Sequence, residues 1–186
     1  MRFLPAAVAA VAFAAPAFGA EVVPVPQFRS VQLQGGGVVT VVPGPTERVT
    51  IVEGSSQYTR MRVEREGRLR IDTCDTRCPQ MYRLRVEIQS PFVPDLAING
   101  GGVIETKGGF RSQSRLSVAI NGGGHIDARA VEASSVSAAV HGGGRILVRA
   151  RSNLSAAVNG GGLVNFWGNP SLSTAVHGGG AVLRGS

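Results

Sequence analysis

The sequence has few of the residues from which most enzyme and metal sites are built. The 186-residue chain holds 2 cysteines, 3 histidines and 12 acidic residues, and aromatic residues make up only 5% of it. In the second half the acids Asp95, Glu105, Asp127 and Glu132 fall at unrelated positions, so no carboxylate cluster for general acid–base catalysis is formed. We therefore expect a protein that is not an enzyme and needs no cofactor or metal ion. A polysaccharide-active enzyme is the least favoured alternative.

Long apolar runs are also absent beyond the first residues. The apolar stretch from Leu4 to Ala15 follows Arg2 and leads into small residues typical of a cleavage site, which predicts a secretory signal peptide over residues 1–20. The stretch is too short for a membrane span. We expect an exported protein in the periplasm or at the cell surface that is not an integral membrane protein.

Lysine is nearly absent. Lys107 is the only one, and arginine supplies all the other positively charged side chains behind the net charge of +7. Such a charge suits binding to an anionic polysaccharide or a membrane surface. The alternative is that the arginines only keep the protein soluble. The densest group of arginines, between residues 60 and 70, alternates with Glu64 and Glu66, which predicts cross-strand ion pairs. Because no aromatic residues are interleaved there, we expect no nucleic-acid partner.

The two cysteines are Cys74 and Cys78. A disulfide between them is the expected state in the oxidising environment of an exported protein. Their spacing differs from that of redox CxxC motifs, and no histidine pair accompanies them to complete a zinc site.

The sequence does contain a repeat, in which an aliphatic residue, an asparagine or histidine and three glycines recur five times. The polar residues of the five copies are Asn99, Asn121, His141, Asn159 and His177. They lie 22, 20, 18 and 18 residues apart, a period that fits one turn of a β-solenoid. Apolar residues occupy every second position before each polar residue and again after the glycines, which is the period of a strand with one buried face.

One copy cannot bury its own apolar face, but stacked copies can. Glycine suits the corners because it tolerates positive φ and close approach of backbones. We therefore expect an all-β right-handed parallel β-helix, or solenoid, with glycine-triplet corners, preceded by a smaller β-strand region. The expected organisation is a signal peptide (1–20), an extended lead-in (21–27), an N-terminal β region (28–90) and a β-helical glycine-repeat region (91–186).

Stacking would place the five polar residues in one column. Amide side chains in a column can form hydrogen bonds from turn to turn, so the predicted role is a structural corner ladder of Asn99, Asn121, His141, Asn159 and His177. His141 and His177 would be two turns apart, ~9.5 Å at the spacing of strands, which is too far for one zinc ion.

Trp167 is the predicted ligand-binding residue. Phe166 falls on the inward register of its repeat, so the next side chain along the strand points outward. The strands of the last repeat would leave unpaired edges, and such edges favour self-association.

Several segments resemble the bacterial envelope family named "putative autotransporter adhesin, head GIN domain". Those resembling its N-terminal pattern are Phe28–Leu33, Val49–Gly54 and Glu66–Ile71, and Val86–Pro94 followed by Leu96 resembles its entry into the repeats. The corners differ, since the family carries Ser-Gly-Ser-Gly where this chain has Asn/His-Gly-Gly-Gly. The resemblance covers about Phe28 to Ser186, and it implies a right-handed parallel β-helix-like fold, export to the envelope and an adhesion or binding role.

Together these observations predict a non-enzymatic exported binding protein, adhesin-like, whose partner is an envelope polysaccharide or a surface protein. The alternative is a structural, self-assembling envelope module.

Overall fold

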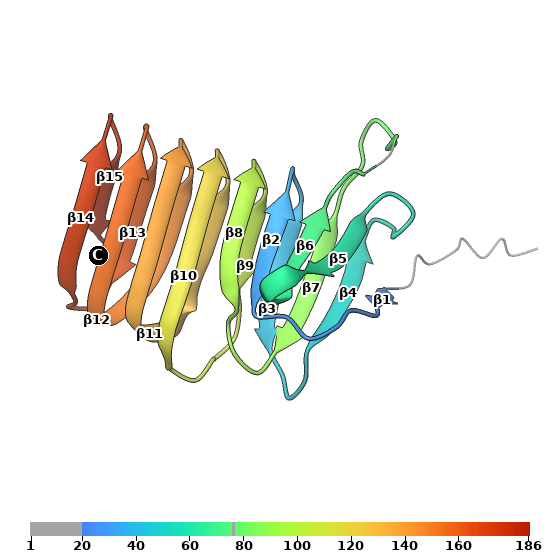
Figure 1. The fold of residues 1–186 in the computed structure, drawn as a ribbon, viewed down its shortest axis with the longest axis horizontal. Helices are drawn as coiled ribbons and strands as arrows, with labels where there is room; N and C mark the ends of the chain where they lie inside the picture. The colour runs from blue at the N-terminus through green and yellow to red at the C-terminus, as the bar shows by residue number, and fades with distance from the viewer. Residues whose placement is uncertain (1–19, 76) are drawn as a thin grey trace, which may run out of the picture.

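The computed structural model describes residues 20–75 and 77–186, so the signal peptide expected over residues 1–20 lies, except for its last residue, outside the described residues. The regular structure of the described residues is β-strands with one short 3-10 turn (Figure 1). The elements are β1 Glu21–Val23, β2 Ser30–Gln34, β3 Val38–Pro43, β4 Arg48–Glu53, β5 Arg60–Glu64, η1 Arg65–Gly67, β6 Arg68–Asp72, β7 Arg85–Ser90, β8 Asp95–Gly100, β9 Val103–Thr106, β10 Gln113–Gly122, β11 His125–Gly142, β12 Arg145–Asn159, β13 Leu163–Trp167, β14 Ser171–His177 and β15 Ala181–Arg184.

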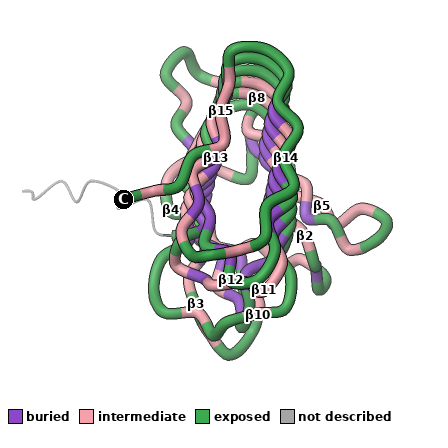
Figure 2. The backbone as a smooth tube through the Cα atoms, turned by 90° about the vertical axis from the view of Figure 1, so that its left-hand side faces the viewer, coloured by how far each residue is buried: buried purple, intermediate pink, exposed green. Residues whose placement is uncertain are grey.

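All the strands belong to one sheet of 15 strands that wraps around a flattened core (Figure 2). One wall carries β5, β6, β2, β8, β10 and β14, and the opposite wall carries β1, β4, β7, β3, β9, β13 and β15. The long strands β11 and β12 contribute to both walls, because their first halves pair with β9 and β13 and their second halves pair with β10 and β14. The sheet is therefore a nearly closed, barrel-like layer around the apolar side chains.

The repeats pair in parallel and in register. Ile120 of β10 lies between Ile98 of β8 and Val140 of β11, one position before the polar residue of each copy. The same register continues into the N-terminal region, where β2 pairs with β8 and β3 pairs with β9. Gln34 and the glycines that follow it therefore form a further copy, which the sequence comparison did not include among the five.

The predicted right-handed parallel β-helix is wrong as a fold class, because the sheet is mixed. β1 pairs antiparallel with β4, β4 with β7, and β5 with β6. The β5–β6 hairpin turns at Glu66 and Gly67, and both turn residues have positive φ. The glycine corners accompany the parallel strands of the repeats, whereas β4 and β5 have antiparallel neighbours only and β6 pairs antiparallel with β5 and parallel with β2.

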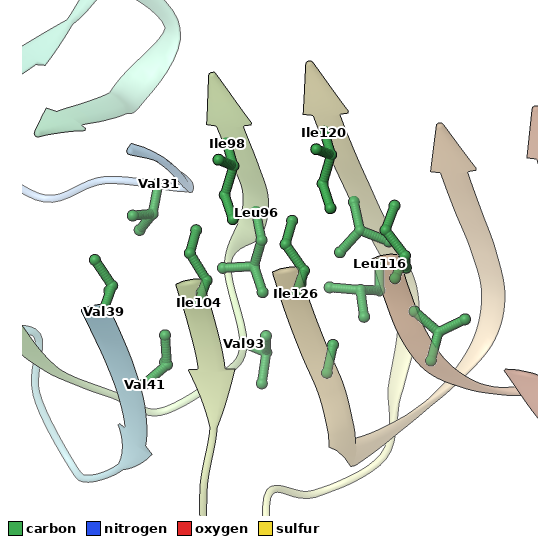
Figure 3. Close-up of a cluster of buried hydrophobic side chains, with 14 of the residues drawn as sticks. Val31, Val39, Val41, Val93, Leu96, Ile98, Ile104, Leu116, Ile120 and Ile126 are labelled. Carbon is green, nitrogen blue, oxygen red and sulfur yellow. The ribbon is translucent and has the colours of Figure 1, made fainter. Parts of the chain in front are cut away.

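The core consists of aliphatic columns between the two walls (Figure 3). Leu96, Ile98, Leu116 and Ile120 line one wall, and Ile104 and Ile126 face them from the other. Each of these side chains is almost fully buried. Burying a side chain of this size stabilises the fold by about 1.5–3 kcal/mol, so stacking the copies provides the apolar burial that one copy lacks.

Cys74 and Cys78 form a disulfide, with Cα atoms 6.0 Å apart, which confirms the expected pairing. The bond lies between β6 and β7, on the loop that follows Asp72. Its ring is short, so it fixes the local course of this loop rather than joining distant parts of the chain.

Candidate functional site

The pairing register places the five polar corner residues side by side. Asn121 pairs with Asn99 and His141, and Asn159 pairs with His141 and His177. All five are exposed. A side-chain hydrogen bond joins Asn159 Nδ2 and His141 Nε2 at 3.2 Å. Because the column lies at the outer rim, water can serve the remaining polar groups, and the ladder as a stabilising element stays a prediction.

A line of small, uncharged side chains faces solvent along the corner strands β10, β11, β12 and β14. Ser117, Ser137, Ser155 and Ser173 pair in sequence along one exposed line. Charged side chains lie elsewhere on the outer surface, in the cluster on β5 and β6 of the same wall and on β9, β11, β12 and β13 of the opposite wall.

Trp167 points outward from β13, while Phe166 is buried, as the alternation of the strand predicts. The indole is not a free platform, however. The guanidinium carbon of Arg129 lies 5.0 Å from the ring centroid, in a cation–π contact. The indole Nε1 donates to the backbone oxygen of Ser186 at 3.3 Å. Trp167 therefore forms a wall of a site that it shares with its neighbours.

The position of Trp167 in its copy is occupied by a basic residue in three of the preceding copies, and these four equivalent residues are called the basic column here. Each member stands eight positions after the polar residue of its copy, and the members are Lys107, Arg129, Arg149 and Trp167. Arg149 of β12 is the direct register partner of Trp167. Sequence reasoning singled out Trp167 but missed the three basic residues, although counting eight positions past each corner would have found them.

The column borders a cleft of about 350 Å³ lined by Thr106, Asp127, Arg129, Ala130, Arg149 and Trp167. The cleft coincides with an irregularity in β11, where the pairing with β12 shifts register between Ala128 and Glu132. A bulge of this kind bends the strand and redirects side chains. It brings Arg129 over the indole instead of leaving it in a regular ladder.

Within the cleft, Arg129 is committed to Asp127. Its Nε and Nη2 donate to the two carboxylate oxygens at 2.9 and 2.6 Å. Partial burial of Asp127 favours its neutral acid form. The hydrogen bonds and the charge of Arg129 outweigh this effect and lower the pKa of Asp127 below its usual value. The hydrogen bond to Asp127 raises the pKa of Arg129. The pair is thus ionised and mutually neutralised.

The two other cations of the column differ in their partners. Lys107 Nζ lies 3.3 Å from a carboxylate oxygen of Glu105. Arg149 is exposed and has no ion pair among the residues that the structure describes. Arg149 is therefore the cation of this cleft that is available to an anionic group from outside.

The denser arginine cluster of the N-terminal region is largely neutralised. Arg62 and Arg70 both reach Asp72, at 2.9 and 2.8 Å, and both lie within 3.6 Å of Glu64. The expected Arg–Glu pairing is confirmed at Glu64, and Asp72 is a second partner that the alternation of charges had not indicated. These arginines form a salt-bridged surface rather than an open cationic site.

In residues 20–75 and 77–186, no three or more His, Cys, Asp or Glu side chains come together as metal ligands. In the same part of the chain, no helix has the length and apolar character needed to cross a membrane.

Residues 112–170 match the family model described as "Putative auto-transporter adhesin, head GIN domain". The resemblance expected from the sequence is confirmed for these residues. They lie in the glycine repeats, whereas the segments that suggested the family lie before them. Arg129, Arg149 and Trp167 all fall within the matched residues.

Among solved structures, a putative adhesin from Bacteroides fragilis NCTC 9343 has a TM-score of 0.53 to this chain at 18% identity, covering 89% of this chain and 95% of that one. A putative adhesin from Parabacteroides merdae ATCC 43184 scores 0.40 at 13% identity, covering 90% and 96%. A putative lipid binding protein from Parabacteroides distasonis ATCC 8503 scores 0.36 at 16% identity, also covering 90% and 96%. The first likeness shows a shared fold. None of the curated proteins matches the chain.

Proposed function

Because residues 112–170 match the head GIN family of putative auto-transporter adhesins, we propose that the chain is an exported, non-enzymatic binding protein of the cell envelope, in the periplasm or at the cell surface. Its ligand is an acidic polysaccharide, which it binds on the outer surface of β9, β11, β12 and β13. The observation that carries this proposal is the position of Arg149, an exposed arginine beside Trp167 at the edge of a cleft.

The chemistry of the cleft suits an acidic sugar. The planar guanidinium of Arg149 can donate two parallel hydrogen bonds to a carboxylate or sulfate group. The indole of Trp167 is half-buried under its contacts with Arg129 and Ser186, and its remaining exposed part supplies apolar surface beside a sugar ring. Adjacent strands repeat at ~4.8 Å, so a chain lying across the strands also meets Arg129 and Lys107. Several weak contacts along one polymer add up to useful avidity.

Larger hollows lie at the N-terminal end of the fold but support this function less well. One of about 710 Å³ is lined by Phe28, Arg29, Glu47 and Glu66, among others. The Glu47 carboxylate there already accepts the backbone N–H of Phe28 at 3.1 Å. This hollow also lies outside residues 112–170 and presents acidic groups to an acidic ligand.

The carboxylates beside the basic column support binding without turnover. Asp127 is held by Arg129, and Glu105 lies beside Lys107. Glu132, the register partner of Arg149 on β11, lies 3.9 Å from a guanidinium nitrogen of Arg151. A glycosidase needs two carboxyl groups placed on either side of the scissile bond, one of them with a raised pKa. Asp127 has the opposite shift. We therefore expect an acidic polysaccharide incubated with the protein to be recovered at its original chain length.

Replacing Arg149 with glutamine is expected to weaken binding of an acidic polysaccharide by about ten- to a hundredfold. A hydrogen bond to a charged group contributes ~1.5–3 kcal/mol, and each 1.4 kcal/mol is about tenfold in affinity. Titration calorimetry with alginate and with neutral dextran measures the effect. Alginate should bind the wild type, more weakly as salt is raised, and dextran should not.

Arg115→Gln is the matched control for this experiment, because Arg115 is an exposed arginine on β10, on the other wall. It removes the same charge and should leave alginate binding at the wild-type level. Equal losses for Arg149→Gln and Arg115→Gln would reduce the interaction to net charge and contradict a site. Absence of alginate binding to the wild type, together with binding of a neutral glycan, would contradict the acidic ligand.

A second role, self-association, is favoured by a separate observation. The last strand of the corner wall leaves apolar side chains exposed, namely Leu172 and Val176 of β14.

A further inference from the structure

The strands at the C-terminal end of the sheet have a partner on one side only. Among the described strands, β14 pairs with β12 alone and β15 pairs with β13 alone. Leu172 and Val176 point toward the core side of β14, in register with Leu154 and Val158 of β12. Leu154 and Val158 are 1% and 0% exposed, whereas Leu172 and Val176 are 52% and 42% exposed. The inward-facing aliphatic positions that are buried on β12 are therefore exposed to solvent on β14.

The opposite end of the same wall is protected in the manner usual for edge strands. Its edge is β5, which carries Arg60, Arg62 and Glu64 in alternation with apolar residues. Charged side chains along an edge discourage pairing with another chain. By contrast β14, Ser171–His177, contains no Asp, Glu, Lys or Arg. The chain thus has one edge protected by charged side chains, β5, and one unguarded edge without them, β14. The charged edge of β5 is a poor partner for the uncharged, apolar edge of β14.

The unguarded edge is complementary to itself. If two copies of β14 pair antiparallel around a two-fold axis through Thr174, all seven residues of each strand find a partner, with Leu172 opposite Val176 of the partner strand. Residues 172, 174 and 176 of both copies then face the same side, because side chains alternate along a strand. Two copies can also meet without like-charge repulsion along this edge.

We propose that β14 is a homodimer interface and that its occupant is β14 of a second copy of this chain, paired antiparallel about Thr174. The pairing supplies the hydrogen-bond partners that the open edge lacks and covers Leu172 and Val176. β15 lies on the opposite wall at the same end (Figure 2), so the axis that joins the β14 strands also brings the β15 strands of the two copies together.

The one charged residue of β15 is compatible with this contact. Arg184 Nη2 donates to the backbone oxygen of Gly168 at 2.9 Å and to Asn169 Oδ1 at 2.7 Å, so the side chain is tied back to its own chain. Because the contact uses the same surface on both copies, it closes after two subunits. The result is a discrete dimer and not an open-ended stack of subunits.

A disulfide trap tests the register. In the proposed dimer the two Thr174 Cα atoms lie opposite each other, about 4.5–5.5 Å apart, within the ~4.4–6.8 Å that a disulfide spans. Thr174→Cys should therefore give a covalent dimer on a non-reducing gel after mild oxidation. Ser173→Cys is the matched control, since its diagonal separation of ~7–8 Å and outward direction leave it unlinked. Equal linkage of the two variants, or linkage of Ser173→Cys alone, would overturn the proposal.

Sedimentation velocity over a range of concentrations tests the interface without a covalent bond. The wild type should show a monomer–dimer equilibrium. Thr174→Lys places two like charges at the two-fold axis and should raise the dissociation constant by at least about tenfold, equivalent to 1.4 kcal/mol. Thr174 is exposed, so the monomer has room for the lysine. Ser173→Lys, which points to solvent in both states, should leave the equilibrium unchanged.

A wild type that stays monomeric at every concentration, one that forms open-ended oligomers, or a dimer that withstands Thr174→Lys would each overturn the proposal. Binding of alginate and dimerisation are separate properties here, because Arg149 lies on the opposite wall from β14. Arg149→Gln should leave the dimer intact, so failure of one proposal is distinguishable from failure of the other.

Discussion

Replacing Gly142 with alanine is expected to lower the free energy of unfolding by about 3 kcal/mol or more. Gly142 has φ +115°, and a Cβ atom there would lie 2.6 Å from the backbone oxygen of Gly122 in the preceding copy. Positive φ alone costs an L-residue about 1–2 kcal/mol. The contact with rigid backbone adds to this, because two parallel strands must separate to relieve it. Urea denaturation followed by circular dichroism measures the change.

Gly143→Ala is the control for this prediction, because the next glycine of the same triplet has nothing within 4 Å of its Cβ position. Its unfolding free energy should change by less than about 0.5 kcal/mol, as for most surface substitutions. The contrast separates the first glycine of the triplet, which the stacking requires, from the second, which it does not. Similar losses at both positions would show that the copies do not stack as described.

Replacing Leu154 with alanine is expected to cost about 2–5 kcal/mol, the usual range for a buried leucine whose removal leaves a cavity. Leu154 is on β12, which has β11 on one side and β14 on the other, and its side chain is 1% exposed. Leu172→Ala removes the same side chain from the same column one strand further on, where it is half exposed. It should cost less than about 1 kcal/mol at concentrations where the proposed dimer is dissociated.

Thermal and urea unfolding of the two variants at low protein concentration decide this comparison. Repeating the measurement of Leu172→Ala at high concentration should reveal a larger loss if the dimer buries this residue. Equal costs at low concentration would mean that Leu172 is as well covered as Leu154 within one chain, contrary to the open edge.

The sequence allowed the strands of the five repeat copies and their relative register to be predicted, because the repeat marks each copy with the same kind of polar residue and glycines. Aligning Asn121 with His141 and Asn159 gives the pairing that the structure shows. The same pattern led to the wrong fold class. It carries no information about β4 and β5, which pair antiparallel: β5 forms a hairpin with β6, and β4 pairs with β7 and β1, which are distant from it in the sequence.

The candidate site could be predicted only in part. Alternation along β13 was enough to place Trp167 outside and Phe166 inside. The role of Arg149 depends on which charges are already neutralised, and that follows from the approach of Arg129 to Asp127 at the irregular part of β11. The change in copy spacing from 20 residues before His141 to 18 after it indicates that the pairing must shift somewhere along β11. The spacing does not indicate that the shift begins after Ala128, beside Arg129.

The central claim is that equivalent residues of successive copies are nearest neighbours across parallel strands. It is tested most directly by paired cysteines on the exposed line of serines. Ser137 and Ser155 are register partners on β11 and β12, so the Ser137→Cys/Ser155→Cys variant should form an internal disulfide on mild oxidation, identified by peptide mass spectrometry. Ser137→Cys/Ser173→Cys spans two strand spacings, ~9.6 Å, and should not. An internal bond in the second variant and none in the first would contradict the stacked arrangement.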